Sequence, residues 1–181
     1  MNKYVSLAKK AVENYIKNGR KISSPKNFDG KRAGVFVSIH KKSEAKAKSR
    51  TESMRGGELR GCIGTIFPTK KNIAEEIIHN AIAAATRDDR FPPVVKNELS
   101  DLKYKVDILS EPETIQGLSS LNPKKYGVIA KTEDGRTGLL LPDILGIDTP
   151  EIQVATACQK AGINPAKEKY FLYRFEVERY Q

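Results

Sequence analysis

The chain has 181 residues, with 32 lysines and arginines against 22 aspartates and glutamates, so its formal net charge is +10. This length suffices for one domain or two tightly joined lobes, and a composition of 39% hydrophobic and 30% charged residues is typical of a soluble globular protein. No apolar run approaches the roughly 18 residues of a membrane helix, and residues 1–10 lack the apolar core of a secretory signal. We therefore expect a cytoplasmic protein that does not enter a membrane.

The first part of the chain predicts a helix followed by a strand. Apolar residues at three- and four-residue steps indicate an amphipathic helix over 3–17, and Asn18-Gly19 supplies its stop. A polar loop over 20–32 precedes a strictly alternating segment, which predicts a strand over 33–40. Residues 41–58 are mostly charged or small, and we interpret them as a flexible basic insertion between two strands.

The remaining elements complete a mixed pattern. A strand over 59–67 leads to a helix capped by Asn72, and further strands begin near 102, 126, 136 and 170. Asp134-Gly135 indicates a hairpin turn, and Thr149 caps a third helix that Gly162 ends. Because hairpins mix with helices without regular βαβ alternation, we expect an α+β fold with a mostly antiparallel sheet, in one domain over 1–181.

The stretch most suggestive of chemistry is Leu59 to Thr65, with the sequence LRGCIGT. In a strand, Arg60, Cys62 and Gly64 share one face, and a guanidinium there favours the thiolate form of a cysteine. Gly61 and Gly64 mark a bulge, or the close approach of a ligand or another backbone. Cys62 is therefore a candidate nucleophile, and the alternative is a small buried hydrophobic residue.

A cysteine nucleophile needs a nearby base, and His40 is the candidate. It ends the strand that precedes residues 41–58, so it would lie near the start of the second strand if the two strands pair. With His40 and His79 as the only histidines, and without C-x-x-C or H-E-x-x-H, a preformed zinc site is not expected. The chain also lacks the phosphate-binding glycine motifs of nucleotide enzymes, and we expect no cofactor.

The helix after Asn72 and the turn that follows it add candidate binding residues. Asn80 and Arg87 are seven positions apart, share a helix face and could point at one cleft, and the alternative for Asn80 is a buried amide that contacts backbone. Asp88 and Arg90 suit a rigid, salt-bridged corner that shapes a site rather than performing chemistry. The predicted substrate-binding set around Cys62 is Arg60, Gly61, Gly64, Asn80, Arg87, Asp88 and Arg90.

Three motifs carry a resemblance to a known family: FVSIHK at 36–41, LRGCIGT at 59–65 and RDDRFPP at 87–93. Over about residues 7–175 the chain resembles the AMMECR domain family, and in particular the stand-alone protein A components of AmmeMemoRadiSam systems. It departs from the usual pattern in the long segment 41–58 and in Asp89, where proline is common.

The resemblance implies an α+β fold of two lobes, with a cleft that Arg60, Gly61, Cys62 and Gly64 line or support. It also implies Memo-type and radical-SAM proteins as partners. It does not place an iron–sulfur cluster in this chain, because two cysteines cannot supply the usual ligands. The family resemblance names no reaction.

Three functions remain open on the sequence. The first is an enzyme, or a component of an enzyme system, that uses Cys62 on a small anionic substrate. The second is a module for nucleotide or RNA, driven by the net charge and by the basic residues of 41–58. The third is a non-catalytic partner of a Memo-type protein. The net charge also fits a lysine-rich solvated surface with no acidic partner.

Overall fold

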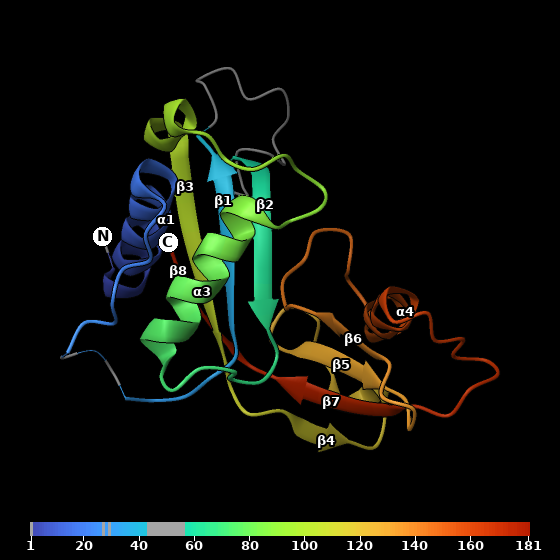
Figure 1. Cartoon of the computed structure of the whole chain (residues 1–181). Helices are drawn as coiled ribbons and strands as arrows, with labels where there is room; N and C mark the ends of the chain where they lie inside the picture. The colour runs from blue at the N-terminus through green and yellow to red at the C-terminus, as the bar shows by residue number, and fades with distance from the viewer. Residues whose placement is uncertain (1, 27, 29, 43–56) are drawn as a thin grey trace. The chain divides into compact units, whose positions relative to one another are not determined.

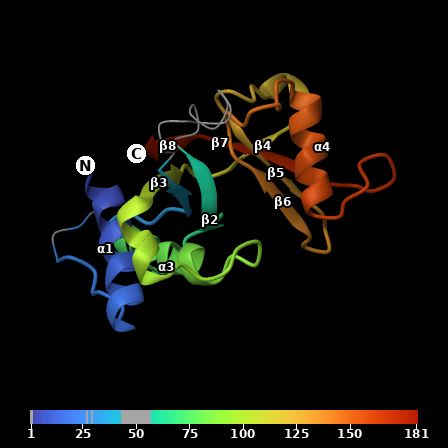
Figure 2. The same ribbon diagram turned by 90° about the horizontal axis from the view of Figure 1, so that it is seen from above.

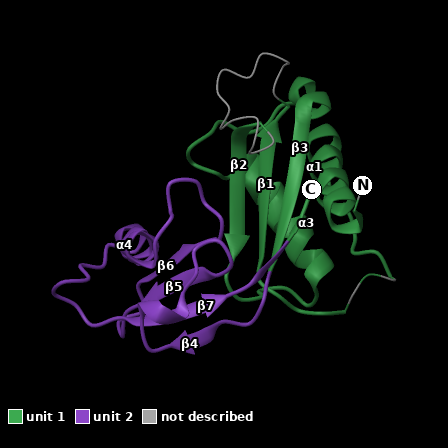
Figure 3. Ribbon diagram, turned by 180° about the vertical axis from the view of Figure 1, so that it is seen from behind, with its two compact units in different colours: residues 1–108, 179–181 green, residues 109–178 purple. Residues whose placement is uncertain are grey.

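The structure, a computed structural model, describes residues 2–26, 28, 30–42 and 57–181. The chain divides into two compact units (Figure 3). Unit 1 comprises Met1–Ile108 and Arg179–Gln181, and unit 2 comprises Leu109–Glu178. The basic insertion predicted for 41–58 lies, apart from its ends, outside the described residues.

Unit 1 is built on a four-stranded sheet, sheet A, in the order β2-β1-β3-β8. Its strands are β1 (Val35–Lys41), β2 (Glu58–Thr65), β3 (Leu102–Leu109) and β8 (Val177–Tyr180). The β1–β2 and β1–β3 pairs are antiparallel. The helices α1 (Lys3–Asn18) and α3 (Ile73–Thr86) cover the same face of the sheet (Figures 1 and 2).

The alternating sequence of β1 explains this two-layer arrangement. Val35, Val37 and Ile39 are fully buried under the helices, and Tyr104 and Val106 of β3 join the same core. α3 is buried almost all round because it packs against β1, β2 and α1 together. The opposite face of sheet A carries the intervening side chains of β1, which begin with Phe36 and Ser38.

The helix ends follow from local chemistry. The Asn72 side chain accepts a hydrogen bond from the Glu75 backbone N–H at 3.0 Å, as the sequence predicted for the start of α3. α1 ends at Gly19, which adopts φ +68° and donates its N–H to the Tyr15 carbonyl. The short helix η1 (Lys96–Asp101) then connects the turn after α3 to β3.

Unit 2 has its own four-stranded sheet, sheet B, in the order β4-β7-β5-β6. The strands are β4 (Glu113–Ile115), β5 (Gly127–Lys131), β6 (Thr137–Leu140) and β7 (Phe171–Phe175), and the pairs between them are antiparallel. The helix α4 (Pro150–Lys160) packs on β5 and β6, and the short helix η2 (Leu118–Ser120) follows β4. Cys158 lies in this core and is fully buried.

The α+β class is confirmed, and one element differs from the prediction. The final strand, expected over 170–178, is two strands: β7 belongs to sheet B and β8 belongs to sheet A. Glu176 separates them, and its backbone N–H and C=O bond the Ser110 side chain and backbone at 3.0 Å. β4 was not predicted, because three residues are too few to show alternation. No helix of the described residues is long and apolar enough to cross a membrane.

Replacing Tyr104 by phenylalanine should leave the protein as stable as the wild type, or stabilise it. The ring is buried in unit 1, and its hydroxyl has no hydrogen-bond partner among the described residues. Removing an unpaired buried hydroxyl recovers a desolvation cost of about 1 kcal/mol. Urea unfolding of wild type and Tyr104→Phe measures the difference, and a loss above about 1 kcal/mol would contradict an unpaired hydroxyl.

Candidate functional site

Cys62 lies on β2, an edge strand of sheet A, opposite Ser38 of β1. The Ser38 hydroxyl donates a hydrogen bond to the Cys62 sulfur at 3.2 Å. Cys62 is partly buried and has a free thiol. The register therefore gives the thiol a hydroxyl neighbour, and this residue was missing from the predicted set.

The backbone of Cys62 is held by the turn after α3. Its N–H donates to Asp88 Oδ2 at 2.8 Å, and its carbonyl lies 3.5 Å from Arg90 Nη2. Arg90 donates through Nε and Nη2 to the two carboxylate oxygens of Asp88, at 2.9 and 2.7 Å. An outer strand presents unpaired backbone groups, and here two charged side chains satisfy those of one residue. The predicted salt bridge between Asp88 and Arg90 is present, and their role in shaping a site stays a prediction.

These contacts set the protonation states at the site. Hydrogen bonds from Arg90, with those from the Cys62 and Arg90 backbones, lower the pKa of Asp88 from 3.8 to about 2. Burial raises the pKa of the Cys62 thiol, and this outweighs the lowering by Ser38 and by the charge of Arg90. Asp88 is therefore ionised at neutral pH, and Cys62 is a protonated thiol.

Arg60 does not serve the thiol as expected. The register shifts between Ile39 and His40, which pairs Ile39 with Gly61 and His40 with Leu59 and leaves Arg60 as the extra residue of a bulge. Its buried guanidinium donates to both carboxylate oxygens of Glu98, at 2.8 and 3.0 Å, and lowers the pKa of Glu98. Arg60 is not among the groups that shift the pKa of the Cys62 thiol, so the structure does not support the expectation that Arg60 favours the thiolate.

His40 lies opposite Leu59, near the start of β2, where the sequence placed it if the strands pair. Its Nδ1 atom is 3.1 Å from the carbonyl oxygen of Gly57, and the side chain is buried. The hydroxyl of Ser38, two positions earlier on β1, is the group that hydrogen-bonds the sulfur. Catalysis by Cys62 and His40 together stays a prediction.

The two glycines of the motif make room for the protein itself. A Cβ atom on Gly61 would lie 2.1 Å from the backbone oxygen of Ala84 in α3, and one on Gly64 would lie 2.2 Å from the ring of Phe36. Of the alternatives left open by the sequence, close approach of another part of the chain therefore explains both glycines. Their predicted role in substrate binding stays a prediction.

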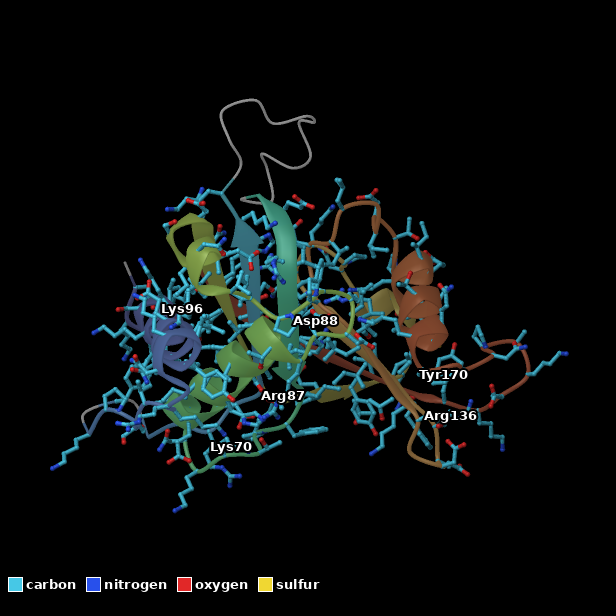
Figure 4. The ribbon with its side chains drawn as sticks, turned by 45° about the horizontal axis from the view of Figure 1, so that its top comes forward. Lys70, Arg87, Asp88, Lys96, Arg136 and Tyr170 are labelled. Atoms are coloured by element: carbon cyan, nitrogen blue, oxygen red, sulfur yellow. The ribbon has the colours of Figure 1, made fainter. Side chains whose placement is uncertain are left out.

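Asn80 and Arg87 do not point into a common space. Asn80 is buried and donates to the Val35 carbonyl at 2.9 Å and to the Thr65 hydroxyl at 3.2 Å. This is the structural role that the sequence left as the alternative. Arg87 caps the C-terminus of α3 and is exposed (Figure 4). The helical spacing was right, but the helix is covered over the face that holds Asn80.

Glu76 is a second residue that the sequence did not identify. Its fully buried carboxylate accepts hydrogen bonds from the Thr65 and Thr69 hydroxyls and from the Thr69 and Lys70 backbone N–H groups, at 2.7 to 2.9 Å. It thereby fixes the loop between β2 and α3. Only its position in the apolar run of α3 could have marked it, since a carboxylate there needs partners.

Unit 2 holds a separate cavity of about 630 Å³. It is lined by residues 114–118, which comprise the end of β4 and the segment after it, and by residues of α4 and β7, and Glu151 is its charged lining residue. None of the residues that the sequence singled out lies in its wall. Within the described parts of both units, His, Cys, Asp and Glu side chains form no cluster of three that could hold a metal ion.

Comparison with known proteins agrees with this fold. The family model AMMECR1 matches residues 5–180, so the chain belongs to the AMMECR1 family. A protein from Thermotoga maritima is 49% identical over 182 residues, which cover 98% of this chain and 97% of that protein. The protein CA_C1420 from Clostridium acetobutylicum is 43% identical over 98% of this chain, which spans 36% of its length.

The similarity extends to a solved structure. The crystal structure of PH0010 from Pyrococcus horikoshii has a TM-score of 0.82 to this chain at 31% sequence identity. The match covers 97% of this chain and 88% of that one. Fold and family therefore agree, and the motifs FVSIHK, LRGCIGT and RDDRFPP lie within the matched region.

The hydrogen-bonded carboxylate of Asp88 should make the free energy of unfolding depend on pH in the acid range. A carboxyl group whose pKa is lowered on folding stabilises the folded protein above its ordinary pKa, here 3.8, and this contribution is lost as pH falls toward 2. Asp88→Asn should therefore lower stability at pH 6 by about 2 kcal/mol and flatten its decline between pH 4 and 2. Urea unfolding across this range measures both effects.

Asp89→Asn is the matched control, because Asp89 is the adjacent aspartate and is exposed. This variant should show the same decline in stability between pH 4 and 2 as the wild type. Equal flattening by the two variants would show that general charge, rather than the contact with Cys62, produces the pH dependence.

Proposed function

We propose that unit 1 binds a small anionic substrate beside Cys62, with Arg90 and Arg87 as the anion-binding groups. The observation that carries this proposal is that Arg90 is both exposed to solvent and held in one orientation. Its side chain is 55% exposed, although Asp88 holds its Nε and Nη2 atoms in place. A guanidinium fixed in this way is oriented before a ligand arrives, which reduces the entropy cost of binding.

Arg90 keeps hydrogen-bond donors for a ligand. Nε and Nη2 bond Asp88, and Nη2 also approaches the Cys62 carbonyl. Nη1 makes no hydrogen bond with a described residue, so its two hydrogens remain for an oxygen of a carboxylate or phosphate. Such an oxygen would lie close to the strand that carries the thiol.

Arg87 supplies the net charge that this arrangement needs. The Asp88–Arg90 pair is neutral as a whole, so it attracts an anion weakly by itself. Arg87 precedes Asp88 in the chain, is exposed, and forms no ion pair with a described residue. The segment 87–90 also carries Asp89, whose exposed carboxylate is screened by solvent.

The protonated thiol defines what Cys62 contributes. At neutral pH it offers an S–H donor and a soft contact to a bound substrate, and it becomes a nucleophile only when a base removes its proton. A bound anion raises the pKa of a neighbouring thiol further. The proposal therefore favours a substrate that brings its own basic group, or a step in which Cys62 stays protonated. Memo-type and radical-SAM partners stay a prediction.

The test is the pH dependence of Cys62 alkylation by iodoacetamide in a Cys158→Ala background, which removes the buried second thiol. We expect slow alkylation at pH 7 and an apparent pKa above the roughly 8.5 of a free thiol. Small carboxylates and phosphate esters should then slow the reaction at fixed pH. Arg90→Gln should weaken this protection about tenfold, the usual size of one charge-assisted hydrogen bond.

Arg20→Gln provides the control for total charge, because Arg20 is another exposed arginine of unit 1. It should leave protection unchanged. Fast alkylation at neutral pH would contradict the protonated thiol. Protection that survives in both Arg90→Gln and Arg87→Gln, or no protection by any anion tested, would refute the proposed binding groups.

A further inference from the structure

The net positive charge of the chain belongs to unit 1. Unit 1 contains 24 of the 32 lysines and arginines and 12 of the 22 aspartates and glutamates, whereas unit 2 contains the remaining 8 and 10. Unit 1 is therefore at +12 and unit 2 at −2. A difference of this size on one chain indicates an acidic partner for unit 1 rather than a uniformly basic surface.

Four acids of unit 1 are engaged by arginines or by neutral hydrogen-bond donors. Asp88 pairs with Arg90, Glu98 with Arg60, and Asp107 with Arg179. Glu76 is fully buried and accepts hydrogen bonds from neutral groups. The surface potential of unit 1 is thus set mainly by lysines and arginines outside these pairs.

The loop between β2 and α3, residues 66–71, combines such cations with an exposed aromatic ring. Phe67 is 59% exposed. Lys70 and Lys71 follow it and form no ion pair with a described residue, and Figure 4 labels Lys70 in this loop before α3. Phe67 is not among the hydrophobic residues that form or pack against the core of unit 1.

The loop is held in one conformation by contacts beneath it. Glu76 accepts from the Thr69 and Lys70 backbone N–H groups at 2.7 and 2.8 Å. Arg32 donates to the carbonyls of Lys70 and Pro68 at 3.3 and 3.4 Å. These contacts set the direction in which Phe67 and the lysines project, and they bring the Arg32 charge to the same loop.

Gly34 adds a backbone contact to this support. A Cβ atom there would lie 2.1 Å from the backbone oxygen of Ile66, so glycine is required where β1 begins. The first residue of the loop is therefore packed directly against the strand. A ring on such a fixed support can receive a flat partner without first being ordered.

Further cations act on His79 of α3. After burial, the charges of Lys70, Lys21 and Arg87 are the largest causes that lower the pKa of His79. One imidazole on α3 therefore experiences cations from the loop after α1, from the loop before α3 and from the C-terminus of α3. Arg32, which donates to the loop, and Lys71 within it add to this positive charge.

We propose that this surface, residues 66–71 with Lys21, Arg32, His79 and Arg87, binds single-stranded nucleic acid. A base stacks on the exposed ring of Phe67, and the phosphates beside it contact Lys70, Lys71 and Arg32. Base–aromatic stacking beside a cationic track for the backbone is the usual mode of single-strand binding with little sequence preference. The surface shares Arg87 with the proposed substrate site, but the stacking on Phe67 and the phosphate contacts of Lys70, Lys71 and Arg32 do not depend on that site.

An acidic protein or a lipid surface fits these observations less well. An acidic peptide would use the cations but leave the exposed ring without a partner. An interfacial membrane segment presents a wide apolar face, and loop 66–71 exposes one large ring above a fixed backbone. A single-stranded nucleic acid supplies both a base for the ring and phosphates for the cations.

The experiment measures binding to the whole chain by fluorescence anisotropy of a labelled thymidine dodecamer, with a uridine dodecamer as the RNA arm. An abasic dodecamer of equal length presents the same phosphates without bases. We expect Phe67→Leu to weaken binding to the thymidine strand about tenfold, the size of one stacked base. The same variant should bind the abasic strand as the wild type does. Phe67→Tyr, which keeps an aromatic ring, should bind the thymidine strand with the wild-type affinity.

The lysines are tested by the salt dependence of binding. For single strands each phosphate contact contributes about 0.7 to the slope of log affinity against log salt. Lys70→Gln with Lys71→Gln should therefore reduce the slope by about 1.4. Lys9→Gln with Lys10→Gln removes the same charge from α1 and should reduce this slope less.

Phe171→Leu is the matched control for the ring, because Phe171 is 47% exposed in unit 2. It should leave affinity for both strands unchanged. Three results would overturn the proposal: no binding of the thymidine or uridine strand, equal effects of Phe67→Leu on normal and abasic strands, or equal slopes for the two lysine pairs. Circular dichroism of each variant shows whether it is folded before its affinity is compared.

Discussion

The hydrogen bond from the Cys62 N–H to the Asp88 carboxylate is the contact on which the candidate site depends. It gives the outer strand of sheet A a partner for a backbone group that would otherwise face solvent. It also fixes the turn after α3, so Arg90 is held by the same carboxylate. One charged group thus links sheet edge, helix end and guanidinium, and the chemistry at Cys62 follows from this geometry.

Most elements could be predicted from the sequence because their signals are local. Alternating apolar residues gave the strands, and caps at Asn72 and Thr149 gave the starts of two helices. The division of the final segment could not be predicted in this way. β7 and β8 are both extended, and what separates them is pairing with different sheets, which depends on residues far away in sequence.

The site was predicted only in part, for a similar reason. Asp88 and Arg90 were placed correctly as a rigid corner because they are neighbours in the chain. Arg60 was not, because a single bulged residue removes it from the face of Cys62 and its partner Glu98 is 38 positions away. Ser38 became part of the site only once the register of β1 against β2 was known.

The order of strands in sheet A has a consequence for synthesis of the protein. Three strands precede unit 2, but β8 follows α4 and all four strands of sheet B. The buried Asp107 of β3 accepts hydrogen bonds from Arg179, which lies on β8. On the ribosome, unit 2 can complete its sheet while the first unit still waits for its fourth strand. Loss of β8 would therefore leave sheet A without its fourth strand, although every helix of unit 1 is made long before it.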